Sequence, residues 1–325
     1  MHWHAWGIFA FVVALLLAAD LGLFQRRVHV IKLREALLAT ALRVLLALIF
    51  CLGIYLGWIG DYPTPELTRQ AGVEFLTGYI VEIALSVDNV FVFALVFGFF
   101  RVPPAYQHRV LFWGILGALV MRAIMIFAAT ALLEHFHWVI YIFAVILIYG
   151  GIKMIRGDKE EIDPSKNPIL KLFRKFVPVT PEFHEQRFLV KIDGRLWATP
   201  LCIVLVAIET TDLIFAVDSI PAVVAITKDR FIVFTSNVFA ILGLRAMYFA
   251  LAGILPLFRY LHYGLSAILV FIGVKMFLSQ TPYKIQTEQS LIVVVSLLAV
   301  SVLASLMLKR EEEASKAKNS SDNQE

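Results

Sequence analysis

Cysteine and charge are both scarce in this chain of 325 residues. Cys51 and Cys202 are its two cysteines, and both fall inside or at the edge of apolar segments. We expect them to behave as small apolar residues rather than as disulfide partners, so redox chemistry gains no support. Charged residues make up 17% of the chain and hydrophobic residues 60%. Neither collagen-like nor low-complexity composition is present.

Two further features are absent: the basic segment of a cleavable signal peptide and a nucleophile with a paired base. The chain begins Met1-His2-Trp3-His4-Ala5-Trp6 and lacks the basic segment of a cleavable signal peptide, so we expect the first apolar helix to stay in the mature protein. No nucleophile with a paired base occurs, so we do not expect an enzyme. The net charge of +4 does not indicate a nucleic-acid partner, because the Lys and Arg residues lie mainly in loops.

Apolar runs that approach the length needed to cross about 30 Å of hydrocarbon dominate the chain. They predict an all-α polytopic membrane protein with about nine transmembrane helices, two inverted three-helix repeats and a small cytoplasmic insert. The expected spans are Gly7–Leu23, Ala36–Ile59, Val73–Phe100, Val110–Leu133, Trp138–Ile155, Thr199–Ile220, Phe231–Leu255, Tyr263–Leu278 and Ser290–Leu308.

The basic residues predict the orientation of these spans. Twenty Lys and Arg residues lie in loops on one side, whereas the other side has only four, at Arg69, Lys228, Arg230 and Lys284. Because positive loops stay in the cytoplasm, we expect the N-terminus outside and the C-terminus inside.

Six segments follow from the pattern. They are residues 1–72 with two helices, 73–155 and 199–278 with one repeat each, the cytoplasmic insert 156–198, the last span in 279–308, and a disordered cytoplasmic tail, 309–325. Within the insert, Ile169–Val177 has the apolar spacing of a helix on the membrane surface. Phe188–Ala198, with Asp193-Gly194 at its centre, predicts a β-hairpin. A mere tether is the alternative interpretation of the insert.

An internal repeat relates the third to fifth spans to the sixth to eighth. Glu82-x5-Asp88-Asn89 corresponds to Asp212-x5-Asp218-Ser219, Met121-Arg122-Ala123 to Leu244-Arg245-Ala246, and Ala144–Met154 to Ser266–Met276. Units of three spans start on opposite sides of the membrane, so the repeats are inverted. Such repeats place a binding site near the midplane, which predicts that Glu82, Asp88, Asp212 and Asp218 surround one point.

Helix geometry limits how these acids converge. Glu209 and Asp212 share a helix face, but Asp212 and Asp218 are about 120° apart on a straight helix. Either the helix breaks near Asp218, helped by Ser219 and Pro221, or Asp218 faces a different neighbour. The same spacing in Glu82-x5-Asp88 favours a break in both copies.

The charge in the spans calls for a partner, because even one central Asp costs roughly 2.5–3.5 kcal/mol. Arg122 and Arg245 would each hold one carboxylate, whereas Lys153 and Lys275 reach the membrane interface and Arg43 lies outside the repeat. Asp20 also lies in a span, outside the repeat. Five acids against two bases favour a cation site over purely structural pairing. The predicted metal ligands are Glu82, Asp88, Asn89, Glu209, Asp212 and Asp218, supported by Ser86, Ser219, Asn237, Arg122, Arg245 and Asp20.

These oxygen donors favour Mg²⁺, Ca²⁺ or Mn²⁺ over Zn²⁺ or Cu²⁺. Several carboxylates in a low dielectric cannot all stay ionised once the metal leaves. Protons should then enter, so metal/proton antiport is a hypothesis at this point.

Three segments, Glu82–Phe91, Asp212–Ala222 and Ser236–Tyr248, resemble the signatures of the TerC family, and the whole chain is similar to its Alx branch. The resemblance implies Mn²⁺ export across the bacterial inner membrane. It points to Glu82, Asp88, Glu209, Asp212 and Asp218 as the metal route, with Mn²⁺ as transported substrate and no organic cofactor. The expected partners are Mn²⁺, protons and the lipid bilayer, with no nucleic acid. The alternative is a membrane scaffold or stress-response protein, of the tellurium-resistance type that names the family, whose acids are structural.

Overall fold

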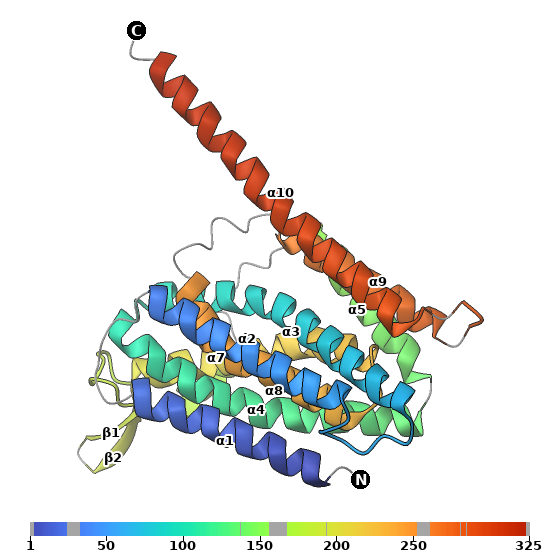
Figure 1. Ribbon diagram of the computed structural model, residues 1–325. Helices are drawn as coiled ribbons and strands as arrows, with labels where there is room; N and C mark the ends of the chain where they lie inside the picture. Colours follow the sequence, from blue (N-terminus) through green and yellow to red (C-terminus); the bar gives the residue numbers. More distant parts are fainter. Residues whose placement is uncertain are drawn as a thin grey trace.

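The computed structural model describes residues 3–24, 33–136, 138–155, 168–192, 194–251, 261–279, 281–283 and 285–322, apart from the side chains of 20–24, 88, 91, 168, 218, 251, 261–262, 306 and 308–322. In these ranges the chain forms ten helices and one hairpin (Figure 1). The elements are α1 Trp3–Phe24, α2 Leu33–Tyr55, α3 Pro65–Phe99, α4 Pro104–His135, α5 Val139–Ile155, α6 Pro168–Phe176, β1 Leu189–Ile192, β2 Arg195–Ala198, α7 Pro200–Val224, α8 Arg230–Leu251, α9 Leu261–Leu278 and α10 Thr287–Asp322.

Each of the nine predicted spans coincides with one of these helices, and an all-α polytopic membrane fold is confirmed. Among the described residues, six helices are long and apolar enough to cross a membrane: α2, α3, α4, α7, α8 and the first part of α10. Shorter apolar segments lie in α1, α5 and α9. The number of helices that cross stays a prediction.

Proline fixes where the central helices begin. Pro65, Pro104 and Pro200 each occupy the first turn of α3, α4 and α7, where a missing backbone N–H costs nothing. Thr64 caps α3 because its hydroxyl accepts a hydrogen bond from the backbone N–H of Leu67 at 3.3 Å. These starts set the register of the polar residues further along each helix.

The central helices pack in pairs that the predicted repeat exchanges. Helix α3 packs against α8 and α4 against α7, while α3 also contacts α7, α4 contacts α8, and α5 lies on α9. Exchanging α3 with α7, α4 with α8 and α5 with α9 leaves these five pairs, the most extensive contacts between the two units, unchanged, whereas minor contacts such as α4 with α5 and α7 with α8 have no counterpart of the same size. The pattern is consistent with a twofold repeat and supports that prediction.

The contact between α5 and α9 is reciprocal at the level of residues. A Cβ atom on Gly151 would stand 2.8 Å from the carbonyl oxygen of Ser266, and one on Gly273 would stand 2.9 Å from the carbonyl oxygen of Ala144. The sequence correspondence pairs Gly151 with Gly273 and Ala144 with Ser266. Each glycine therefore admits the backbone of the other repeat, as expected for a twofold contact.

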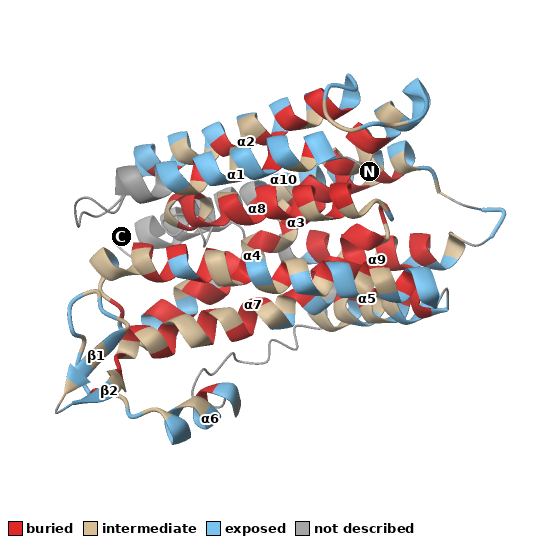
Figure 2. Cartoon of the chain, turned by 90° about the horizontal axis from the view of Figure 1, so that it is seen from below, coloured by how far each residue is buried: buried red, intermediate tan, exposed pale blue. Residues whose placement is uncertain are grey.

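Helix α8 lies at the centre of the bundle. Buried residues make up 83% of its apolar segment but only 33% of that of α2, and Figure 2 shows the exposed face of α1 and α2. Trp6, Phe9 and Phe50 join α1 and α2 to Phe231 and other rings of α8. Helix α10 packs on α9 and α3 and then extends past the bundle (Figure 1).

The predicted hairpin is confirmed, with β1 and β2 antiparallel and Gly194 in its turn at φ +80°. A helix is likewise confirmed at α6, although its position at a membrane surface stays a prediction. Both parts are fastened to the bundle. The Leu170 side chain of α6 is buried, and the Thr199 hydroxyl donates to the carbonyl oxygen of Arg187 at 2.6 Å.

Two expectations are wrong. Helices α3 and α7 are unbroken, and α7 continues through Pro221 to Val224. The expected disordered tail is helical to Asp322, because α10 does not end with its apolar part. The tail is rich in Glu, Lys and Ala, which are good helix formers, and Glu312 precedes Lys316 at the favourable i, i+4 spacing.

Candidate functional site

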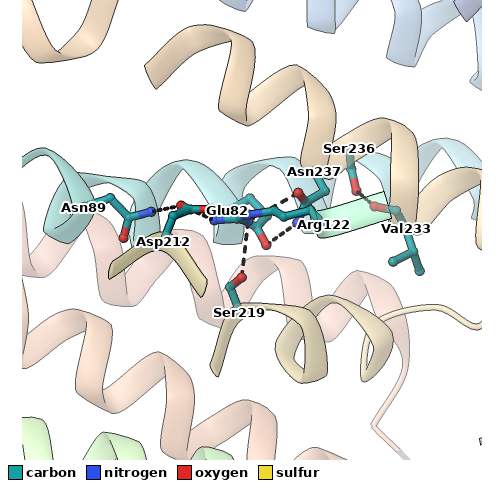
Figure 3. Close-up of polar contacts among 8 residues, drawn as sticks. All are labelled: Glu82, Asn89, Arg122, Asp212, Ser219, Val233, Ser236 and Asn237. Carbon is teal, nitrogen blue, oxygen red and sulfur yellow. Dashed lines mark hydrogen bonds and ion pairs between the residues drawn. The ribbon is translucent and has the colours of Figure 1, made fainter. Parts of the chain in front are cut away.

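Arg122 of α4 lies at the centre of the bundle and is 1% exposed. Its Nη1 donates to Glu82 Oε2 at 2.8 Å, to Asn237 Oδ1 at 3.2 Å and to Ser219 Oγ at 3.3 Å. Its Nη2 donates to Asp212 Oδ1 at 3.2 Å and its Nε to Asp212 Oδ2 at 3.4 Å. One guanidinium therefore joins a carboxylate of α3 to a carboxylate of α7 (Figure 3).

Uncharged side chains from both predicted repeats complete the network. The Asn237 amide of α8 donates to Glu82 Oε1 at 2.6 Å, and the Asn89 amide of α3 donates to Asp212 Oδ1 at 3.4 Å. Asn89 follows Glu82 by seven residues and Ser219 follows Asp212 by seven, which is two helical turns and returns to the same face. A straight helix is sufficient for this arrangement, so neither α3 nor α7 needs the break that we expected.

Glu209 lies beside this network, against α4. It is half-buried, and a Cβ atom on Gly117 would overlap its carboxylate, with Oε1 nearest and Oε2 at 2.7 Å. No hydrogen bond or ion pair joins Glu209 to another residue of the described chain. The position that corresponds to Asn237 in the first repeat is Gly114, where a Cβ atom would stand 4.0 Å from Oε1 of the same carboxylate. The two repeats therefore differ here, because glycines make room for Glu209 where α8 has Asn237.

The structure brings together six predicted site residues: Glu82, Asn89, Arg122, Asp212, Ser219 and Asn237. Ser86 is buried one turn from Glu82, and its hydroxyl has no hydrogen-bond partner among the described residues. Asp88, Asp218 and Asp20 were also predicted, but their side chains lie outside the described part of the chain. Arg245 is buried on α8.

One detail of the predicted site needs correction. We expected Arg122 and Arg245 to hold one carboxylate each, but Arg122 holds both Glu82 and Asp212. That all four repeat acids surround one point stays a prediction, because the side chains of Asp88 and Asp218 lie outside the described part of the chain. Among the described residues, no three His, Cys, Asp or Glu side chains form a metal-binding group.

Sequence reasoning missed a cavity of about 360 Å³ at the end of the bundle that carries the α7–α8 loop. Gln70 and Glu74 of α3, Thr227 after α7 and Lys275 of α9 are among its lining residues, and Gln70 Nε2 donates to Glu74 Oε1 at 2.7 Å. Glu74 precedes Glu82 by eight residues. The spacing of Gln70, Glu74 and Gly78 ahead of Glu82, four residues each time, was the available signal.

A hydrogen bond closes the same end of the bundle. The Tyr62 hydroxyl, in the loop between α2 and α3, donates to Asp229 Oδ2 at 2.9 Å in the α7–α8 loop. Burial, and then the negative charge of Asp229, raise the pKa of Tyr62 above its ordinary value. Arg230 also forms an ion pair with Glu134 at the end of α4.

The arrangement is a buried, oxygen-lined centre around one guanidinium. Two carboxylates against one guanidinium leave a net negative charge in the network, and Glu209 adds to it. Removing water from such charges is expensive, so their close pairing stabilises the folded state only with the extra hydrogen bonds seen here. The oxygen donors present suit a hard cation.

Comparisons with known proteins agree with this architecture. A model of the integral membrane protein TerC family matches residues 67–313. The chain is 49% identical over 311 residues to "Uncharacterized membrane protein STKORF319" of Myxococcus xanthus, covering 96% of this chain and 94% of that protein. It is 44% identical to "Putative membrane-bound redox modulator Alx" of Escherichia coli (strain K12), with 92% of each chain covered. The Salmonella typhi protein of the same name is 42% identical, with 95% of each chain covered. No solved structure matches the chain. The chain belongs to the TerC family of integral membrane proteins.

Proposed function

We propose that this TerC family protein exports divalent metal ions, above all Mn²⁺, from the bacterial cytoplasm by alternating access. The observation that carries the proposal is the meeting of Glu82 and Asp212, one from each predicted repeat, in the buried centre of the bundle. Transporters built from inverted repeats bind their substrates at such an interface. The neutral oxygen donors of Ser219 and Asn237 stand beside the two carboxylates.

The charge of the core supports a divalent substrate. The buried Arg122 and Arg245 supply two positive charges to the middle of the repeat helices, where α3 and α7 carry five acids: Glu82, Asp88, Glu209, Asp212 and Asp218. The formal charge of these seven residues is −3. Intramembrane acids without enough bases mark ion routes because a bare negative charge in a low dielectric is costly. A divalent cation reduces that charge more effectively than a single proton.

The choice of metal rests on two arguments of different strength. Oxygen donors limit the substrate to hard cations such as Mg²⁺, Ca²⁺ and Mn²⁺. Mn²⁺ within that group follows only from the resemblance to the TerC family, and the names of the relatives state no metal.

A row of positions on α3 supplies a route away from the centre. Glu74, Gly78, Glu82 and Ser86 are four residues apart and so are neighbours along the helix surface. Glu74 is about 12 Å from Glu82 along the axis and lines the cavity. Gly78, between the two acids, packs closely against α8 and α7: a Cβ atom there would stand 3.0 Å from Ser236 Oγ and 3.3 Å from Val223. We take the cavity as the outer opening of the route, with the N-terminus on that side and the C-terminus in the cytoplasm.

Flux in proteoliposomes tests the proposal. The full-length protein should move Mn²⁺, and comparison with Mg²⁺, Ca²⁺ and Zn²⁺ at several pH values would define selectivity and proton coupling. In cells, Asp88→Asn should cause Mn²⁺ to accumulate. Unchanged cellular Mn²⁺ in that strain, together with no flux in vesicles, would refute Mn²⁺ export.

A membrane-bound redox modulator is the second candidate, and the names of the Alx relatives favour it. A redox role would act through Cys51 or Cys202, which are both free thiols. Cys51→Ser with Cys202→Ser should abolish such a role but leave Mn²⁺ flux intact.

A scaffold role would instead use the exposed bases of α6. Charge reversal at Lys171, Arg174 and Lys175 tests it without removing the insert, which is fastened to the bundle. A scaffold should lose its function in this variant, whereas a transporter should keep its flux.

A further inference from the structure

The Arg122 guanidinium sits in a cage of oxygen atoms. Five oxygens surround it: Glu82 Oε2, Asp212 Oδ1 and Oδ2, Ser219 Oγ and Asn237 Oδ1. They come from α3, α7 and α8, whereas Arg122 reaches in from α4 (Figure 3). Two carboxylates, a hydroxyl and an amide oxygen are also a donor set for a hard divalent ion. The guanidinium therefore occupies the place that a metal ion between the two carboxylates would take.

The two cations cannot share this place. Two unit charges about 4 Å apart repel by about 4 kcal/mol at an effective dielectric constant of about 20, and a divalent ion doubles that repulsion. Ser86 is a further oxygen donor on the helix that carries Glu82. It lies one turn from Glu82 on α3, and its hydroxyl is buried without a hydrogen-bond partner among the described residues.

We propose that Arg122 is a tethered counter-cation that alternates with the transported ion. It pairs with Glu82 and Asp212 when the site holds no metal and leaves them when the metal binds. This inference rests on the proposed function. Its physical advantage is that the empty carrier never buries two bare carboxylates, which would be costly during the return step. Competition by the side chain also weakens metal binding and so speeds release.

The competing interpretation is a permanent ion pair. In that case Arg122 stays on Glu82 and Asp212 throughout the cycle, and the metal binds elsewhere in the core. The two interpretations differ in what the loss of the guanidinium does to metal affinity.

The test uses full-length protein in proteoliposomes, with Mn²⁺ as the probe. Arg122→Gln should bind Mn²⁺ at least about tenfold more tightly, which is ~1.4 kcal/mol, and both KM and maximal flux should fall. Arg122→Lys keeps a tethered cation without the guanidinium fork and should bind Mn²⁺ more weakly than Arg122→Gln does. Arg43→Gln is the matched control, because Arg43 is also buried but donates to Ala39 of its own helix. It should change neither quantity.

Equal or weaker Mn²⁺ binding by folded Arg122→Gln would overturn the inference in favour of a permanent pair. If that variant does not fold, Glu82→Gln is compared with Glu82→Gln/Arg122→Gln, in which charges are removed in balance. Loss of Arg122 should still tighten binding in this pair, and no tightening refutes the proposal. Failure of the wild type itself to bind or move Mn²⁺ would instead refute the proposed function.

Discussion

Gly117→Ala should displace Glu209 without altering any acid. The added methyl group would overlap the whole Glu209 carboxylate: Oε1 would be nearest, and even the more distant Oε2 would be only 2.7 Å away. Ordinary contact begins at about 3.5 Å, so the carboxylate must withdraw by at least about 1 Å. It can do so because it is the end of a flexible side chain, and the fold should remain intact.

Gly117→Ala should weaken Mn²⁺ binding and leave the free energy of unfolding almost unchanged. Alanine in place of glycine favours a helix by about 1 kcal/mol, and a strained Glu209 rotamer costs about 0.5–1.5 kcal/mol. The free energy of unfolding should thus change little. Moving a carboxylate from about 4 to about 5 Å from a divalent ion costs about 1.7 kcal/mol at an effective dielectric constant of about 20. That corresponds to roughly 15-fold weaker Mn²⁺ binding.

The assay is a double-mutant cycle on the Mn²⁺ dissociation constant, combined with thermal unfolding in detergent. Gly117→Ala should have no further effect in a Glu209→Ala background, where the overlap is gone. Gly98→Ala and Gly243→Ala are matched controls, because a Cβ at either helical glycine meets nothing within 4 Å. The reasoning fails if Gly117→Ala binds Mn²⁺ as the wild type does, or if it weakens binding equally in the Glu209→Ala background.

Three further predictions concern stability. Asn237→Ala leaves buried Glu82 without its 2.6 Å donor and should lower the free energy of unfolding by about 1–3 kcal/mol in denaturant titration; no change would mean that another group replaces the amide. Tyr62→Phe should cost about 1 kcal/mol near neutral pH. Because the folded-state pKa of Tyr62 is raised, the stability it contributes is complete below its unfolded pKa of about 10 and is lost as pH rises beyond it. Thermal melts from pH 8 to 11 should therefore fall more steeply for the wild type than for Tyr62→Phe, and parallel curves would contradict the assignment to the Asp229 contact. Gly151→Ala would meet backbone of α9 at 2.8 Å, which cannot yield cheaply, so the melting temperature should drop, corresponding to about 1–3 kcal/mol, whereas the two control glycines should show no drop.

The sequence alone predicted the membrane class, the positions of the helices and the six residues that form the buried network around Arg122. Long apolar runs need no tertiary information, because a helix in hydrocarbon must satisfy its backbone hydrogen bonds internally. The acids in those runs were conspicuous because a charged side chain in hydrocarbon is costly. The repeat then related Glu82 to Asp212, and the structure joins them through Arg122.

Helix continuity was not predictable from the same spacing. Glu82 and Asp88, like Asp212 and Asp218, cannot share one face of a straight helix, which suggested a break. The contacts of the described side chains use Asn89 and Ser219, one residue further on and two full turns from Glu82 and Asp212, and these need no break. Spacing shows which residues share a face but not which of them the neighbouring helix will engage.

The sequence by itself determined that charge must be balanced inside this membrane protein, because burying carboxylates in a span is too costly to go uncompensated. Only the tertiary structure decided what balances it in the arrangement seen here. Arg122 could have served one carboxylate, but packing of α3, α4 and α7 around α8 brings both acids to the same guanidinium. Packing likewise places Glu209 on the bare backbone of Gly117. Such choices depend on the distances between helices, which a linear pattern of residues does not contain.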